Sequence, residues 1–370
     1  MHTIQSGHFY TTITKNHWNT IVIGGGQAGL AAGFHLKNAG DDFIIFDASG
    51  KTGDSWRLRW DSLRLFTPAR FNELPGWSYP SQSSPSMTKD QMAEYLELYA
   101  RHFSLPVRLG IRVIKLSKDS NGFVLETADQ TFTCNQVVVA TGTNQLPYVP
   151  AFSMQLDPEI VQLHAAAYRS PNDIPYGNVL VVGGATSGIE IALELSRTRH
   201  TILAGKPSFV VPAGAFRFGP KFYWWFTNNI LTVNTPIGRK ARANIIKGGA
   251  VIPQLLERLK NTTVEQVPRV IGVREGTPVL EDGRILEDLG AVIWCTGYRP
   301  DFGWIDIKSI IGTNGWPSTK RGVSTAAKGL YFMGVPFQFG LSSGLVGGVG
   351  RDAGYIVHRI MRNQLKKEKI

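Results

Sequence analysis

The chain contains the same glycine-rich turn twice, and each copy follows an apolar run typical of a buried strand. The first copy, GGGQAG at 24–29, follows the run 20–23, and the second, GGATSG at 183–188, begins 159 residues later. A strand, such a turn and a helix form the phosphate-binding part of a dinucleotide-binding unit. Two copies therefore predict an α/β fold with two Rossmann-like dinucleotide-binding domains.

The first turn has all three glycines of the pattern. Gly24 makes the tight turn, Gly26 lets the backbone approach a pyrophosphate, and Gly29 lets the helix pack closely on the strand. The helix N-terminus that follows favours an anion. A second apolar run, FIIF, ends in Asp47, 23 residues after Gly24, where a carboxylate can accept hydrogen bonds from ribose hydroxyls. The turn therefore predicts a tightly held dinucleotide.

The second turn departs from the first at two positions. Ala185 replaces the middle glycine, and Lys206 stands at the offset where the first unit has Asp47. The methyl group holds a pyrophosphate slightly further out, which suits an exchangeable cofactor. An ammonium attracts a 2′-phosphate that a carboxylate repels. The second unit therefore predicts NADPH, with NADH and a solvated loop lysine as the alternative. Arg197 and Arg199, just before the same predicted strand, are further candidates for the phosphate.

Two matching phrases predict how the domains are connected. VVVATG at 137–142 and VIWCTG at 292–297 are apolar runs that end in Thr-Gly. We expect them to carry the chain from one domain to the other and back. The predicted FAD-binding domain comprises 1–148 and 291–370, with the NADP-binding domain, 149–290, inserted into it. One tightly held and one exchangeable dinucleotide predict a flavin enzyme that a nicotinamide reduces.

Residues 211–250 of the inserted domain combine an aromatic run with a basic run. Three interpretations stay open: a packed insertion, the wall of a substrate tunnel, or a peripheral membrane contact with aromatics in the interface and basic groups toward anionic lipid.

Composition bounds the other function classes. Hydrophobic residues make up 43% and charged residues 18% of the 370, as in a globular protein with a sizeable core. The net charge of +11 has no nucleic-acid-binding motif beside it, so we expect no nucleic-acid partner. Cys134 and Cys295 form neither a CxxC pair nor a metal-ligand spacing, and a cytoplasmic location without a metal is expected. No apolar window reaches the roughly 18 residues of a membrane span, and the N-terminus has no signal-peptide core.

Four further stretches, at 53–70, 110–116, 295–302 and 329–353, resemble segments of class B flavin-containing monooxygenases and their bacterial relatives. In this resemblance 110–116 corresponds to a strand. The similarity runs from about residue 18 to about residue 360. With the first turn, it implies an FAD site formed by Gly24, Gly26, Gln27, Ala28, Gly29, Asp47, Ser55, Trp56, Leu65, Thr67, Val113, Ala140, Thr141, Gly142, Gln338 and Leu341. With the second turn, it implies an NADP site formed by Gly183, Ala185, Thr186, Ser187, Gly188, Lys206, Thr296, Gly297 and Tyr298.

The monooxygenase signature of that family, F-x-G-x-x-x-H-x-x-x-Y/F, is only half kept. His164 and Tyr168 are present, whereas Pro158 and Ile160 replace the phenylalanine and the glycine. Binding of FAD and NADPH is therefore a safer prediction than oxygenation. His164 is interpreted either as a linker residue that orders the domain junction or as a catalytic residue.

The resemblance implies an NADPH-dependent monooxygenase that inserts one oxygen atom of dioxygen into a small organic substrate through a C4a-peroxyflavin. N-oxidation, S-oxidation and Baeyer–Villiger oxidation all stay open. The alternatives are a non-oxygenating NADPH:FAD oxidoreductase or oxidase and a flavin-bound sensor without turnover. The substrate and the oligomeric state, a homodimer among the options, are not determined by the sequence.

Overall fold

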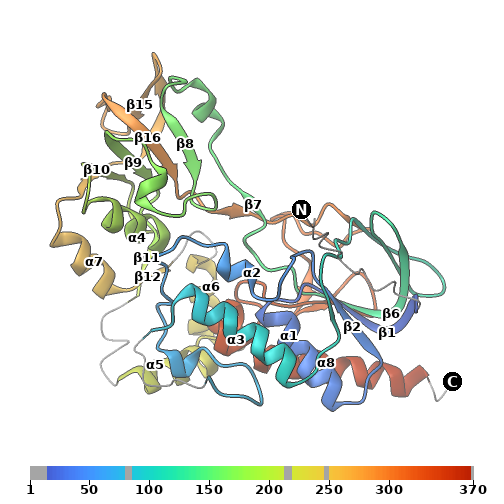
Figure 1. Cartoon of the computed structure of the whole chain (residues 1–370). Helices are drawn as coiled ribbons and strands as arrows, with labels where there is room; N and C mark the ends of the chain where they lie inside the picture. The colour runs from blue at the N-terminus through green and yellow to red at the C-terminus, as the bar shows by residue number, and fades with distance from the viewer. Residues whose placement is uncertain (1–14, 80–85, 212–218, 246–249, 368–370) are drawn as a thin grey trace, which may run out of the picture.

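The two predicted strand–turn–helix units lie in two separate sheets (Figure 1). The computed structural model describes residues 15–79, 86–211, 219–245 and 250–367. Ten strands form the first sheet and five form the second. The strands of the second sheet lie, in chain order, between those of the first, so one unit is inserted into the other.

In the first unit, β1 is central and pairs in parallel with β2 and β6. The antiparallel pairs β4–β5 and β5–β6 extend this sheet on one side, and β21 adds in parallel to β6. Its strands are β1 His17–Ile23, β2 Phe43–Phe46, β3 Val107–Arg108, β4 Lys115–Lys118, β5 Phe123–Glu126, β6 Thr131–Val139, β18 Ile305–Asp306, β19 Thr319–Lys320, β20 Val323–Ser324 and β21 Leu330–Phe332.

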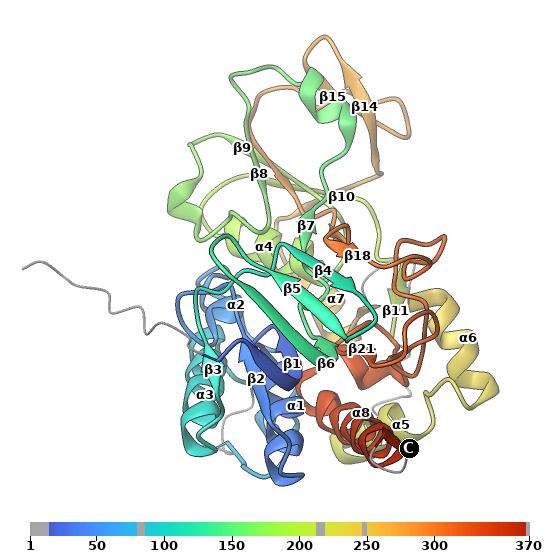
Figure 2. The ribbon, with the colours of Figure 1, turned by 90° about the vertical axis from the view of Figure 1, so that its right-hand side faces the viewer.

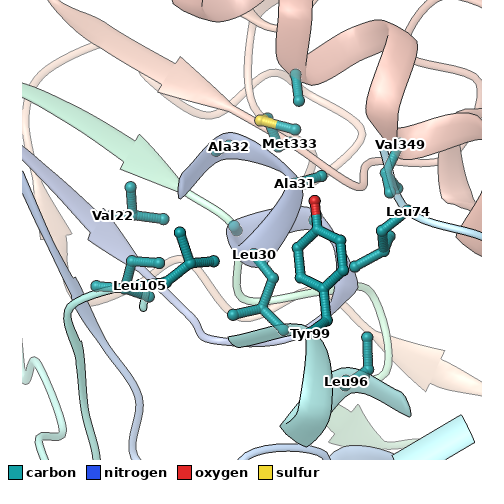
Figure 3. Packing of buried hydrophobic residues seen from close by; sticks show 14 of the residues in the cluster. Val22, Leu30, Ala31, Ala32, Leu74, Leu96, Tyr99, Leu105, Met333 and Val349 are labelled. Carbon is teal, nitrogen blue, oxygen red and sulfur yellow. The ribbon is translucent and has the colours of Figure 1, made fainter. Parts of the chain in front are cut away.

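Helices cover one face of this sheet and enclose its core (Figure 3). Val22 of the sheet, Leu30 of α1, Tyr99 of α3 and Val349 of α8 are all buried in one cluster. The Tyr99 hydroxyl is satisfied inside it, since it donates to the Pro75 carbonyl at 2.6 Å. The helical segments of this unit are α1 Gln27–Asn38, α2 Asp54–Arg57, η1 Ala69–Phe71, α3 Lys89–His102, η5 Leu341–Gly344 and α8 Val346–Lys367.

The second sheet has the order β13-β10-β9-β16-β8, and all its pairs are parallel. Its central strands are continuous apolar runs because helices or loops cover both faces. Its strands are β8 Val161–His164, β9 Asn178–Val182, β10 Thr201–Ala204, β13 Glu265–Val267 and β16 Leu289–Trp294, with the hairpin β14 Val270–Arg274 and β15 Thr277–Leu280. Its helical segments are η2 Ala151–Gln155, η3 Pro171–Asp173, α4 Thr186–Leu195 and α7 Pro253–Lys260.

Two short strands connect the units, and they pair with each other. β7, Leu146–Pro147, leaves the first unit and β17, Tyr298–Arg299, returns to it as its antiparallel partner. Each follows one of the Thr-Gly phrases. β16 lies wholly in the second sheet, so the boundary predicted at 290/291 falls inside a strand.

The segment 211–250 extends from the second unit onto the first (Figure 2). It leaves through β11, Phe209–Val210, and returns through β12, Ala250–Val251, which pair in parallel. Its helices α5, Gly219–Asn229, and α6, Pro236–Ile245, contact η5. Residues 212–218 and 246–249 lie outside the described residues. The described helices are therefore a packed insertion.

The stretch 110–116, expected as one strand, becomes a strand only at Lys115. Ile111 instead donates its backbone N–H to the Asp47 carbonyl at 2.9 Å. This bond carries the segment across the end of β2 before it joins the sheet. Val113 therefore lies in the irregular segment that crosses the end of β2 near Asp47, and it is not part of a strand.

Candidate functional site

The first and third glycines of the first turn are required by the fold itself. Gly24 has a φ of +107°, and a Cβ there would lie 2.5 Å from the Ala140 carbonyl oxygen. A Cβ on Gly29 would lie 1.8 Å from the Gly24 carbonyl oxygen. Both positions are closed by backbone, which cannot move aside as a flexible side chain can.

Gly26 is different, because the fold does not demand a glycine there. Its backbone is extended, with a φ of −78°, and it is the N-cap of α1. Apart from its immediate neighbours, no atom of the described chain lies within 4 Å of where its Cβ would be. The open space faces unpaired N–H groups of a helix N-terminus, which is where an anionic group binds.

Asp47 is fixed beside this turn at the end of β2. Its Oδ2 accepts a hydrogen bond from Gly25 N at 2.5 Å, and its Oδ1 accepts one from Ser49 N at 2.7 Å. A carboxylate has about four acceptor positions, so two bonds leave room for ribose hydroxyls.

Three distant segments meet next to the first turn. Trp56 Nε1 donates to Gln27 Oε1 at 3.2 Å, and Gln27 Nε2 donates to the Gly344 carbonyl at 3.4 Å. Leu65 and Thr67 are buried in the same unit, whereas Ser55 is exposed. The segment 53–70, the start of α1 and the C-terminal η5 are thus brought together.

Gln338 is a buried amide whose side chain lacks hydrogen-bond partners in the described chain. It is 8% exposed, and within the described part of the chain neither its Nε2 nor its Oε1 has a hydrogen-bond partner. An unpaired buried amide costs about 1–3 kcal/mol. A flavin ring offers both hydrogen-bond donors and acceptors, so the residues present fit this cofactor. Ala140, Thr141, Gly142 and Leu341 lie at the ends of elements of the same unit, after β6 and at the start of η5.

The second turn repeats the geometry of the first. Gly183 has a φ of +122°, with its missing Cβ 2.4 Å from the Cys295 carbonyl oxygen. The missing Cβ of Gly188 lies 1.8 Å from the Gly183 carbonyl oxygen. Ala185 takes the place of Gly26 as N-cap of α4, with a φ of −91° that suits an alanine. Thr186 and Ser187 begin this helix.

Lys206 is exposed at the end of β10 and is not the only cation there. Arg269 donates from Nη2 to Glu281 Oε1 at 2.8 Å. The pKa of Glu281 is lowered, first by that hydrogen bond and further by the charge of Lys206. Lys206, Arg269 and Glu281 therefore form one exposed charged group. Sequence reasoning missed Arg269, because only the fold brings the β13–β14 connection to this strand end.

Arg197 and Arg199 lie at the wrong end of β10 for the predicted role. They precede the strand, whereas Lys206 follows it, and four residues of strand span about 13 Å. Arg199 is also engaged, since its guanidinium donates to the carbonyls of Pro171, Ile174 and Pro175 at 2.7–2.9 Å. It ties η3 to the sheet instead.

The junction of the two units is organised around His164. Its Nδ1 accepts a hydrogen bond from Ala166 N at 3.1 Å, so its Nε2 carries the proton and donates to the Gly297 carbonyl at 3.0 Å. Burial lowers the pKa of His164, and the nearby charge of Arg59 lowers it further. The ring also contacts Tyr298 edge-on, with centroids 5.0 Å apart.

Arg59 of the first unit completes this junction. It donates from Nη1 to the Tyr298 hydroxyl at 2.9 Å. The Thr296 hydroxyl donates to the Tyr148 carbonyl next to β7. Tyr168 of the half-kept signature is fully buried and donates to Glu194 Oε2 at 2.7 Å. Sequence reasoning missed Arg59, although it lies within the stretch 53–70.

Comparisons with known proteins agree with this architecture. An uncharacterised CzcO-like oxidoreductase of Geobacillus kaustophilus is 36% identical, with 93% of this chain and 99% of the relative covered. The probable indole-3-pyruvate monooxygenase YUCCA3 of Arabidopsis thaliana is 28% identical, covering 80% of this chain and 77% of the relative. The structure of a flavin-containing monooxygenase from Stenotrophomonas maltophilia superposes with a TM-score of 0.77 at 26% identity, covering 94% and 99% of the two chains.

A second dinucleotide unit inserted into a first defines the class of two-domain flavoprotein monooxygenases and reductases. The chain belongs to the pyridine nucleotide-disulphide oxidoreductase family, whose model matches residues 21–208. It is an oxidoreductase of the flavin monooxygenase type. Both cysteines are free and lie in different units, so the described chain has no redox disulfide. Within the described residues, no helix has both the length and the apolar character needed to cross a bilayer.

Proposed function

We propose that the protein is an FAD-dependent, NADPH-using monooxygenase that transfers one oxygen atom of dioxygen to a small organic substrate. The observation that carries the proposal is the pair of turns whose middle positions, Gly26 and Ala185, are the extended N-caps of two helices, with open space around Gly26. Bound FAD would supply the hydride acceptor and the oxygen chemistry. The protein binds and orients the cofactors and the substrate, and it excludes water from the site.

In this proposal the first unit holds FAD and the second holds NADPH. Gly26 leaves room for the FAD pyrophosphate, Asp47 accepts ribose hydroxyls, and the amide of Gln338 pairs with the flavin ring. Lys206 and Arg269 attract the 2′-phosphate of NADPH, with Glu281 as an opposing charge. The exposed position of all three limits this preference, because solvent screens exposed charges.

His164 serves as a positioning residue in this proposal. Its Nε2 donates to the Gly297 carbonyl, and its Nδ1 accepts from Ala166 N. Both ring nitrogens are therefore engaged by the backbone, and neither is free to take up a proton. It therefore sets the path of the segment 296–298, where the nicotinamide cofactor is proposed to lie.

The second candidate function is an NADPH oxidase that releases hydrogen peroxide without transferring oxygen. The altered signature favours it: Ile160 is partly buried against the core of the second unit, where the family pattern has a glycine. The local path of 158–160 can thus differ from that of an oxygenating relative.

One experiment tests both candidates. Purified FAD-loaded protein is mixed with NADPH in air, and NADPH consumption, hydrogen peroxide and oxygenated product are quantified with and without thioether, amine and ketone substrates. A monooxygenase gives product in proportion to NADPH and little peroxide when a substrate is present. Peroxide equal to NADPH with every substrate supports the oxidase, and no consumption of NADPH contradicts both.

A further inference from the structure

A hollow of about 350 Å³ lies where η1, α5 and the first turns of α8 meet. Sites for small molecules are typically about 300–1,000 Å³, so this hollow is large enough for one. Its apolar wall includes Phe71, Trp224 and Pro75, and its charged lining consists of Arg70, Glu73 and Arg351. Neither predicted nucleotide turn contributes to it.

The apolar wall contains a stacked pair of aromatic rings. The rings of Phe71 and Trp224 stack with centroids 5.3 Å apart and planes at 20°. α8 allows this close approach because it has a glycine below the rings: a Cβ on Gly347 would lie 2.1 Å from the Phe71 carbonyl oxygen and 2.8 Å from Trp224 Cζ2. A planar apolar group gains most from such a wall, through offset stacking.

Arg351 is occupied by the protein itself. It donates to the Asn228 carbonyl at 2.7 Å, to Asp352 Oδ1 at 3.0 Å and to Ser343 Oγ at 3.3 Å. It thereby clips α5 to η5 and α8. These bonds position the Trp224 side of the wall and leave Arg351 without a free donor edge for a ligand.

Arg70 is the cation of the hollow that is available to a ligand. It is exposed, its guanidinium lies 4.9 Å from the Phe71 ring centroid, and it forms no hydrogen bond or ion pair with the described chain. Glu73, the carboxylate of the lining, accepts a hydrogen bond from Ser78 Oγ at 3.1 Å. A guanidinium beside an aromatic ring is suited to the carboxylate of a ligand whose body stacks on that ring.

The hollow adjoins the proposed flavin site through one rigid turn. Asn72 Nδ2 donates to the Thr67 carbonyl at 2.9 Å, and the Thr67 hydroxyl donates to Asn72 Oδ1. Thr67, a residue of the proposed flavin site, is buried in this turn, and Arg70 and Phe71 of the same turn line the hollow.

We propose that this hollow binds a small ligand with a flat apolar body and a carboxylate: the body on the Phe71–Trp224 wall and the carboxylate on Arg70. The proposal rests on the proposed function in one respect, that this ligand is the molecule oxidised. Binding itself requires neither NADPH nor turnover.

The test measures binding to the FAD-loaded protein by calorimetry without nicotinamide. The probes are (phenylthio)acetate, whose thioether can be oxygenated, and its uncharged amide, 2-(phenylthio)acetamide. We expect the carboxylate to bind about tenfold tighter than the amide, the effect of one partly screened charge-assisted contact. Arg70→Ala removes that preference, and the matched control Arg274→Ala, an exposed arginine of β14, leaves it intact. Trp224→Leu weakens both probes by the same factor.

Equal affinity for the two probes, or an unchanged preference in Arg70→Ala, would overturn the assignment of the hollow. A second measurement, oxygenated product formed from the carboxylate with NADPH in air, separates the two proposals. Arg70-dependent binding without any NADPH-dependent oxidation leaves the hollow assigned and contradicts the monooxygenase. Oxygenation that does not depend on Arg70 supports the monooxygenase and overturns the hollow as its substrate site.

Discussion

The two glycine-rich turns share their backbone and differ at the positions that face outward. Gly24 and Gly183 have positive φ values of 107° and 122°, and the missing Cβ atoms of Gly29 and Gly188 both lie 1.8 Å from a backbone carbonyl oxygen. By contrast, the middle position is extended in both turns, and the space around Gly26 is open. The first and last glycines of each pattern thus serve the fold, and the middle position, Gly26 in the first turn, is free to serve a ligand.

The two units also differ in how the end of the second strand contacts the glycine-rich turn. In the first unit the Asp47 side chain closes on the turn by accepting from Gly25 N. In the second unit backbone takes that place, because a Cβ on Gly184 would lie 2.5 Å from the Gly205 carbonyl oxygen. Lys206, the residue after Gly205, is exposed. Comparing the two turns residue by residue therefore separates the positions that the fold requires from the positions that are available to bind a ligand.

The largest effect is expected at the third glycine. In Gly29→Ala and in Gly188→Ala the new methyl group meets a backbone carbonyl, so we expect each to lose more than about 4 kcal/mol of stability or to fail to fold. Thermal unfolding followed by circular dichroism measures this loss. A variant that melts like wild type would show that the turn adjusts and that the third glycine is not required by the fold.

Gly26→Val should separate binding from folding. The branched side chain enters open space, so the apoprotein should melt within about 1 kcal/mol of wild type. FAD affinity should fall at least about a hundredfold, since the side chain occupies the proposed pyrophosphate position, which is worth about 2.7 kcal/mol. Absorbance of the purified protein after gel filtration measures occupancy, and Ala185→Gly, which should keep FAD, is the matched control. Full occupancy in Gly26→Val contradicts the FAD assignment of this turn.

The helices that follow the turns differ in charge at one position, where α1 has the buried Ala31 and α4 has the half-buried Glu190. Burial, partly offset by Arg258, raises the pKa of Glu190 to about 7. Its folded pKa is therefore above its unfolded value, so its contribution to stability is full below about pH 4.5 and is lost as the pH rises through 7.

Glu190→Gln should therefore gain stability relative to wild type between pH 5.5 and pH 8, by at most about 2 kcal/mol, because the partly exposed carboxylate is screened by solvent. The Tm difference between variant and wild type at the two pH values measures this gain. Glu257→Gln, at an exposed carboxylate of α7, is the control that should show no such trend. A difference that is the same at both pH values would mean that the Glu190 carboxylate is solvated.

The smallest effect is expected at the exposed cations of the second unit. Lys206→Ala should lower the NADPH/NADH ratio of kcat/KM by up to about tenfold, because exposure puts the loss at the low end for a charge-assisted contact. The double variant with Arg269→Ala should lower it further, and Arg199→Ala, at the other end of β10, should leave it unchanged. An unchanged ratio in the double variant removes the NADPH assignment and leaves the two-unit architecture as it is.

Local sequence predicted the parts of this molecule that depend on neighbouring residues. The strand–turn–helix units and the acid at Asp47 follow from period, glycine spacing and strand ends, and the structure has them where expected. Arg59, Arg269 and the unpaired amide of Gln338 acquire their surroundings only through contacts between segments far apart in the chain. The path of 110–114 was also missed, since its apolar alternation is that of a strand whereas a hydrogen bond to the Asp47 carbonyl bends it elsewhere.

The pairing of β7 with β17 holds the two chain crossings between the units side by side. Because the outgoing and returning strands are hydrogen-bonded side by side, Tyr298 beside Pro147, they resist separation but permit rotation about their common direction. Further bonds between the units oppose such a rotation: Arg59 donates to the Tyr298 hydroxyl, and Asp61 N donates to the Arg169 carbonyl at 2.8 Å. The insertion adds another, since Leu341 N of η5 donates to the Leu231 carbonyl at 3.0 Å. A change in the angle between the two units therefore requires these bonds to break together.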